Sequence, residues 1–529
     1  MDGIPGCDFR PGDNASVRTA TRRQPALIDL AQARFENTFV RDLPADPVHI
    51  NIPRPVSNAC YTRVEPTPVA APKLLAWSDA LGEFLGLSRP SEEAIEALGG
   101  NRVLPGMQPY AARYGGHQFG HWAGQLGDGR AITLAEIVAT DGSRQELQLK
   151  GAGKTPYSRT ADGRAVLRSS LREFACSEAM FHLGVPTTRA LCLIGTGEPV
   201  MRDMFYDGHP APEPGAIVCR VAPTFVRLGN FQILTANDEA DALKRLADYV
   251  IREHFAGLSY AAWYQEICRR TALLMVDWMR LGFVHGVMNT DNLSILGVTI
   301  DYGPYGWLEG YDPMWTPNTT DAQGRRYCYG NQPGIAQWNL ARLAEALLPI
   351  VEREKLEEGL NLYADTFNEA WRGALAQKLG LESPDEELAA EVLEALAETE
   401  TDFTIFFRQL ARVPLQGDDA ALLAPLRAAF YADDAPHDRL VAWLRRYVKK
   451  VAADRAARMD RVNPKYVFRN YLAQQAIDAM AAGDPSVLER LMRVLEHPYD
   501  EQPESEEFAA RRPEWARHKA GCSALSCSS

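Results

Sequence analysis

The stretch "ELQLKGAGKTPYSRTADGRAVLRSSLREF", Glu146–Phe174, decides how the rest of the chain is interpreted. It contains GAGKT after a strand-like alternation of apolar and polar residues, and so resembles a phosphate-binding P-loop. A P-loop has the form G-x-x-x-x-G-K-[ST], and its first glycine lets the backbone wrap a phosphate. Counting back from Gly153 places Gln148 at that position, inside the alternating strand. The sequence therefore argues against a P-loop and directs attention to Lys150, which ends the strand.

Lys150 has a candidate partner in Glu173, which lies on a predicted helix after a polar loop. Protein kinases use such a strand lysine and helix glutamate to hold ATP phosphates, although a solvated lysine and an ordinary glutamate are the alternative. Upstream, Gly124, Gly127 and Gly129 lie between two strand-like runs in "GQLGDGRAITL". A glycine-rich turn of this kind lets backbone N–H groups approach phosphates closely.

The downstream stretch "LGFVHGVMNTDNLSILGVTIDYGPYG" completes the order of motifs. Kinase-like phosphotransferases carry H-x-D-x-x-x-x-N followed by D-[FYW]-G. Aligning His285 with that histidine places Asn292 and Asp301 on the metal-binding positions, and their oxygens suit Mg²⁺. The kinase catalytic base is replaced by Val287, which cannot accept a proton, so Asp291 is the substitute carboxylate.

Two arginines, Arg220 and Arg227 in "CRVAPTFVRLG", supply more positive charge than a kinase needs around its nucleotide. Surface salt bridges are the alternative explanation. If the nucleotide were bound in reverse, its β- and γ-phosphates would need such a clamp and its α-phosphate would face the acceptor. That geometry predicts transfer of AMP and release of pyrophosphate.

Composition narrows the class of protein. The chain has 529 residues, 46% of them hydrophobic and 24% charged, and a net charge of −13 without a long basic stripe, so nucleic acid is not expected as a partner. The N-terminus has no apolar core of a signal peptide, and no apolar run approaches the length of a membrane span. We expect a cytoplasmic protein without a membrane partner. Nine cysteines without zinc-like spacing argue against a disulfide framework or a structural zinc site.

The pattern of periodicities predicts an α+β protein in which a β-rich N-lobe precedes a helical C-lobe, with helical extensions at both ends. The order of the kinase-like motifs along these parts indicates a protein-kinase-like bilobal fold. "APKLLAWSDALGEFLGL" and "SEEAIEALGG" are expected to be helical, and two short strands are expected around "LSILGVTIDYG". The expected parts are a loose tail (1–25), an N-terminal extension (26–110), the N-lobe (111–235), the C-lobe with catalytic and metal loops (236–385), a helical extension (386–500) and a C-terminal tail (501–529).

These motifs resemble the selenoprotein O family, kinase-fold proteins that act as protein adenylyltransferases. The matching stretches include "YAARYGGHQFGHWAGQLGDGRAI", "LQLKGAGKTPYSRTADGRAVLRSSLREF", "RVAPTFVRLGNF" and "HGVMNTDNLSILGVTIDYGPYGWLEGYDP". The resemblance implies transfer of AMP from ATP, or of UMP from UTP, to Ser, Thr or Tyr hydroxyls of other proteins, with Mg²⁺ or Mn²⁺ as cofactor.

The resemblance also assigns roles to individual residues. Asp291 is expected to accept the proton, Asn292 and Asp301 to bind the metal, and Glu173 to orient Lys150. The residues expected to contact the nucleotide are Gly127, Gly129, Arg130, Lys150, Asp162, Gly163, Arg220, Arg227 and Asp301.

The cysteines depart from the family pattern. The family's C-terminal pair is often spaced Cys-x-x-Cys, whereas here Cys522 and Cys527 are farther apart, in a tail not expected to belong to the core. Bacterial relatives tend to have a cysteine where this chain has Pro317, and Cys328 is the nearest substitute. Redox control through Cys527 is therefore a hypothesis with an open partner. Two other functions remain open: a phosphotransferase of kinase-like fold, and an inert nucleotide-binding scaffold, which Val287 would favour.

Overall fold

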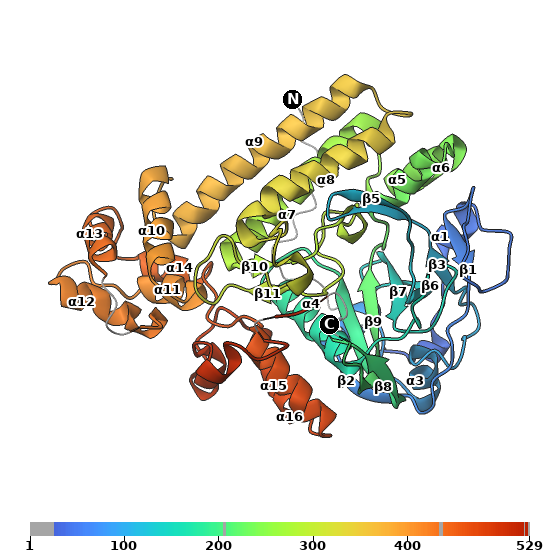
Figure 1. The fold of residues 1–529 in the computed structure, drawn as a ribbon, viewed down its shortest axis with the longest axis horizontal. Coiled ribbons are helices and arrows are strands. Elements are labelled where there is room, and N and C mark those ends of the chain that lie inside the picture. The colour runs from blue at the N-terminus through green and yellow to red at the C-terminus, as the bar shows by residue number, and fades with distance from the viewer. Residues whose placement is uncertain (1–25, 205–207, 433–436, 523, 527–529) are drawn as a thin grey trace.

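The computed structural model describes residues 26–204, 208–432, 437–522 and 524–526 (Figure 1). Its N-terminal part is built on a β-sheet and its C-terminal part is helical, as the sequence predicts. Figure 1 shows the sheet at one end of the molecule and α10–α14 at the other, with the long helix α9 (Arg353–Lys378) extending between them. Among the described residues, no helix combines the length and apolar character needed to span a bilayer.

The main sheet has seven strands in the order β1-β3-β6-β7-β9-β8-β2, and every neighbouring pair is antiparallel. Its strands are β1 (Tyr61–Arg63), β2 (Lys73–Trp77), β3 (Tyr110–Ala112), β6 (Ala131–Val138), β7 (Arg144–Lys150), β8 (Arg189–Arg202) and β9 (Ala211–Ala222). The central strands are buried along nearly their whole length because both faces of the sheet are covered: one packs on the N-terminal segments and the other on α4 (Leu167–His182). This packing places α4 against β8 and β9.

The helical part begins directly after β9. Its first helices are α5 (Leu228–Ala236), α6 (Ala240–His254), α7 (Tyr260–Leu281), α8 (Gln332–Leu347) and α9. The loop between α7 and α8 contains the short pair β10 (Phe283–Val284) and β11 (Gly306–Trp307). The extension comprises α10 (Glu386–Glu398), α11 (Phe403–Leu410), α12 (Asp419–Leu423), α13 (Asp438–Tyr447), α14 (Arg455–Asp460), α15 (Asn470–Ala481) and α16 (Ser486–Leu495).

One local prediction is wrong. The run expected to be one helix from "APKLLAWSDALGEFLGL" is instead strand β2 followed by α2 (Asp79–Leu85). Ser78 separates them, because its side chain caps the amide of Leu81. The two short strands expected around "LSILGVTIDYG" are present as β10 and β11, which lie on either side of that run, and the run itself forms isolated bridges.

The N-terminal segment is more closely integrated than an extension. It contributes β1, β2 and part of β3 to the main sheet, and it also carries α1 (Thr38–Asp42) and α3 (Glu92–Leu98). Helix α3 agrees with the prediction for "SEEAIEALGG", with Ser91 as its N-cap and Gly99 at its end. Edge strands from this segment thus complete the sheet that holds Lys150.

Candidate active site

The predicted ion pair is present. Lys150 ends β7, Glu173 lies on α4, and the Lys150 Nζ to Glu173 Oε2 distance is 2.5 Å. The Glu173 side chain is 2% exposed and that of Lys150 13% exposed. Burial lowers the pKa of Lys150, while the Glu173 carboxylate opposes that shift. The structure thus orients a strand lysine by a buried helix glutamate.

The same helix glutamate also meets Arg220 of β9. The Arg220 Nη1 atom donates to Glu173 Oε1 at 3.0 Å and to Asp301 Oδ1 at 2.6 Å. Arg227 donates through its own Nη1 to the other Asp301 oxygen and, at 2.8 Å, to the carbonyl of Asp291. The two predicted clamp arginines and the predicted metal ligand therefore form one buried cluster, which the sequence did not foresee.

The Asp301 carboxyl within that cluster has a strongly lowered pKa. Burial alone would raise the pKa of its carboxyl, but Arg227, Arg220 and Lys150 together lower it far below the ordinary value. Its backbone is left-handed, with φ of 60°. Asp301 is consequently a permanent anion that counters the positive charge of the site.

The loop that carries Asp291 and Asn292 is organised by His285. The buried His285 ring donates from Nε2 to the carbonyl of Ile300 at 2.8 Å and stacks on Trp278. Because this ring nitrogen donates to the residue before Asp301, His285 links the loop of Asp291 to the loop of Asp301. Asn292 donates from Nδ2 to the carbonyl of Val287 at 3.1 Å, which leaves its side-chain oxygen for another partner.

Asp291 lies in a short 3-10 turn, η2 (Thr290–Asn292), and is 6% exposed. Burial raises the pKa of its carboxyl to about 6. Gln118 donates to Oδ2 at 3.2 Å, whereas Oδ1 is buried without a hydrogen-bond partner. A carboxylate with a raised pKa and one free oxygen is suited to accept a proton.

The hairpin of β4 (Gly115–Gln118) and β5 (His121–Gln125) covers this loop and was not foreseen as part of the site. The sequence predicts a glycine-rich turn between two strands, but β5 pairs with β4, and β6 pairs with β3 and β7. The signal that could have identified the hairpin is the "GGHQFGH" run itself, in which glycines flank polar side chains without apolar alternation.

Gly127 and Gly129 lie in the segment that joins β5 to β6, and both approach Tyr157 closely. A Cβ atom at Gly127 would lie 2.4 Å from Tyr157 Cγ, and one at Gly129 would lie 3.0 Å from the Tyr157 carbonyl. These contacts give both glycines a packing role in addition to any phosphate contact. Arg130 follows them, and burial lowers the pKa of its guanidinium.

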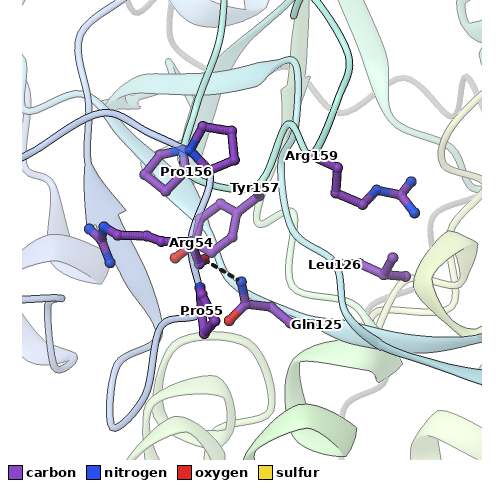
Figure 2. A pocket seen from close by; sticks show the side chains of 8 residues that line it. Arg54, Pro55, Gln125, Leu126, Pro156, Tyr157 and Arg159 are labelled. Carbon is purple, nitrogen blue, oxygen red and sulfur yellow. Dashed lines mark hydrogen bonds between the residues drawn. The ribbon is translucent and has the colours of Figure 1, made fainter.

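A cavity of about 300 Å³ opens beside this segment, lined by prolines, arginines and Tyr157 (Figure 2). Gln125 is one of the residues that line this cavity, and its side-chain amide donates to the carbonyl of Arg54 at 2.9 Å. The cavity lies next to the glycines, whereas its lining does not include the ion-paired residues of the charged cluster.

Asp162 and Gly163 lie in the loop before α4. Asp162 forms a two-pronged ion pair with Arg202 at 2.6 and 2.9 Å. Gly163 has φ of 75° and leaves no room for a side chain against Gly153. The loop that resembles a P-loop is thus a packed turn, and its Lys154 is exposed. No helix follows the lysine directly, because α4 begins only at Leu167, which excludes the P-loop.

The donor set fits a hard cation only in part. Asn292 and Asp301 offer oxygens, which Mg²⁺ and Mn²⁺ prefer. Within the described residues, no group of three or more His, Cys, Asp or Glu side chains is arranged to hold a metal ion. A cation at this site would therefore take most of its ligands from phosphates and water, as Mg²⁺ does in nucleotide sites.

The cysteines of the redox hypothesis are inaccessible where the structure describes them. Cys328 and Cys522 are buried, and burial raises the pKa of the Cys522 thiol to about 11. Cys527 lies outside the described residues. The expectation that the tail stays outside the core is wrong for Cys522, whose carbonyl accepts a hydrogen bond from Asn470 at 2.9 Å.

Known proteins match nearly the whole chain. A family model described as "Protein adenylyltransferase SelO" matches residues 51–496. A relative from Nitrosospira multiformis, named protein nucleotidyltransferase YdiU, is 61% identical over 95% of this chain and 98% of its own length. Relatives of the same name from Aromatoleum aromaticum and Rhodopirellula baltica are 56% and 55% identical, each over 94% of this chain and 99% of their own length.

Proposed function

The chain belongs to the SelO family of protein adenylyltransferases, and we propose that it transfers AMP from ATP to Ser, Thr or Tyr hydroxyls of proteins and releases pyrophosphate. We also propose that residues 111–235 and 236–385 are the two lobes of a kinase-like fold. The Lys150–Glu173 pair and the order of the later motifs support that fold.

The observation that supports AMP transfer most directly is the convergence of Arg220 and Arg227 on Asp301, beside Lys150. A buried cluster of guanidinium groups suits the concentrated charge of a pyrophosphate leaving group. Arginine forks bind phosphate in a fixed geometry, so the terminal phosphates would lie inward and the α-phosphate would face Asp291. Arg130, Gly127, Gly129, Asp162 and Gly163 would contact the remaining nucleotide.

The chemical step exchanges one phosphorus–oxygen bond for another. The acceptor hydroxyl gives its proton to Asp291 while its oxygen bonds to the α-phosphorus, and the bond from that phosphorus to the pyrophosphate oxygen breaks. Asp291 is buried and has a free oxygen for this proton. Asn292 and Asp301 would hold Mg²⁺ or Mn²⁺, which neutralises phosphate charge when bound.

Radioactive labelling tests the proposal. Protein incubated with α-³²P-ATP and Mg²⁺ should incorporate label into itself or an acceptor protein, and γ-³²P-ATP should give none. Label from γ-³²P-ATP alone would contradict AMP transfer and favour a phosphotransferase. No label from either nucleotide, with ATP demonstrably bound, would favour an inert scaffold. Parallel incubation with α-³²P-UTP measures whether UMP is also transferred.

A further inference from the structure

The β4–β5 hairpin is bound to the loop of Asp291 by a set of hydrogen bonds across a long stretch of sequence. The amide of His117 donates to Thr290 Oγ1 at 2.7 Å. The amide of Phe119 donates to Asn289 Oδ1 at 3.1 Å. Two backbone donors of the hairpin, separated by Gln118, thus bind the residues directly before Asp291, so the hairpin and the loop form one unit.

Within this unit the two oxygens of Asp291 have different surroundings. Oδ2 accepts a hydrogen bond of 3.2 Å from Gln118 Nε2. Oδ1 is buried and lacks a hydrogen-bond partner. It lies against Gly116, where any Cβ atom would come within 2.4 Å of it. The absent side chain at Gly116 is therefore what lets the Asp291 carboxylate occupy this position.

We propose that Gln118 is a positioning residue for AMP transfer: its amide holds Oδ2 while Gly116 packs against Oδ1, so that the carboxylate keeps the orientation in which it accepts the proton of the acceptor hydroxyl. This inference rests on the proposed role of Asp291. In the step concerned, the hydroxyl proton passes to the Asp291 carboxylate as the acceptor oxygen bonds to the α-phosphorus and pyrophosphate departs. A carboxylate free to rotate would present its proton-accepting oxygen in the productive direction for less of the time.

Gln118→Met tests this role because methionine keeps a similar shape and loses the amide donor. We expect kcat for AMP transfer to fall by about 10- to 100-fold. The KM for ATP, the Kd for ATP and the thermal unfolding midpoint should stay close to the wild-type values, since Gln118 lies on the acceptor side. A merely structural role would instead lower the midpoint and weaken ATP binding. His121→Ala, an exposed change on the same hairpin, is the matched control and should leave kcat unchanged.

Two further variants test the roles of Gln118 and Gly116 separately. Gln118→Glu replaces the donor with a like charge and should lower kcat at least as far as Gln118→Met. Gly116→Ala should abolish transfer while ATP still binds, because the added methyl displaces Asp291. If Asp291→Asn is inactive but both Gln118 variants keep kcat within about twofold of wild type, the positioning role is wrong and the proposed function stands. Wild-type protein that transfers no AMP would overturn both.

Discussion

Asp301 is shared between two arginines, and this sharing explains how a strongly cationic site stays stable without a nucleotide. The Arg220 side chain is 2% exposed and that of Arg227 3% exposed, so neither can rely on water. Each guanidinium would cost several kcal/mol to bury alone. The Asp301 carboxylate supplies the counter-charge to both, and a triphosphate would compete with it for the same donors. The site is thus built around an anion that phosphate can replace in part.

The geometry of the Arg227 guanidinium can be tested by substitution. Its Nη1 donates to both Asp301 and the Asp291 carbonyl. A lysine ammonium would have to donate to these two groups from a different position. We expect Arg227→Lys to lower kcat/KM for ATP by about tenfold or more, because the charge remains and the geometry is lost. Arg252→Lys, at an exposed ion pair with Asp42, is the control and should change nothing measurable. An Arg227→Lys variant with wild-type kcat/KM would remove Arg227 from the clamp.

Much of the site was visible in the sequence because its motifs are local. The order of Lys150, Glu173, Asn292 and Asp301 follows known spacings, and the structure brings Lys150, Glu173 and Asp301 into one cluster. Gln118 was missed because its partner Asp291 is distant in sequence, and no periodicity links a hairpin glutamine to a loop carboxylate. The pairing of arginines with Asp301 was missed for the same reason: it is a tertiary contact.

Strands β6 and β7 place two glutamates opposite each other. Glu136 and Glu146 are partners in the antiparallel register, and both are buried. Glu146 accepts hydrogen bonds from Thr224 Oγ1 at 3.0 Å and from the Phe225 amide at 3.3 Å. Burial, with Glu136 adding to it, raises the pKa of Glu146 from 4.5 to about 8. This strand pair therefore holds a proton at neutral pH.

Glu146 should make the stability of the sheet depend on pH. The unfolded chain releases the Glu146 proton near pH 4.5, whereas the folded protein keeps it to about pH 8, so the free energy of unfolding falls as pH rises between these values. Glu146→Gln removes this contribution and should reduce the loss between pH 5 and pH 8 by about 1 kcal/mol or more, measured by urea unfolding. Exposed Glu357→Gln should behave as wild type. Equal pH dependence in all three proteins would contradict the assignment.

The misassigned helix has a physical cause. The β2 residues are apolar enough for either a helix or a strand, and pairing with β8 decides in favour of the strand. In the segment after Asn292, Leu293, Ile295 and Ile300 are buried, while Ser294 and Thr299 form isolated bridges to other segments instead of a continuous ladder. In both segments the sequence pattern predicts burial, and the neighbouring chain determines the hydrogen bonding.

A buried ionic cluster joins the helical extension to the loop after Asp301. Arg469, 1% exposed, binds Asp402 through two hydrogen bonds of 2.8 and 2.9 Å. The same guanidinium contacts Glu309, which follows β11. Asp402 also caps α11 through the amide of Ile405 at 3.0 Å. The extension is thereby anchored to the catalytic part of the chain, which supports a buttressing role.

Arg469→Met tests how much this anchor contributes. It would leave Asp402 and Glu309 buried without their counter-ion, so we expect the free energy of unfolding to fall by roughly 3–5 kcal/mol, measured by urea denaturation. Arg439→Met removes an arginine that also meets two glutamates, but at the surface, and should cost less than about 1 kcal/mol. Similar losses in both variants would show that the buried cluster contributes no more than a surface pair.

The end of the described chain also returns to the loop that follows Asp301. The Leu525 amide donates to the Pro317 carbonyl at 3.0 Å, and the Thr319 amide donates to the Leu525 carbonyl at 2.8 Å. The Leu525 side chain is completely buried. Since backbone pairing and apolar burial act together here, the C-terminal segment should restrain residues 317–319 in the folded protein.

Leu525→Ala should loosen that restraint. Loss of a buried leucine costs about 2–5 kcal/mol where it packs, which is enough to open a local contact before the whole chain unfolds. We expect amide hydrogen exchange at Thr319 to accelerate, while exchange at strands β7 and β9 stays at the wild-type rate. Leu348→Ala, a change at a half-exposed position on the end of α8, is the control and should leave Thr319 protected. Unchanged exchange at Thr319 in Leu525→Ala would mean that this loop holds its conformation without the C-terminal segment.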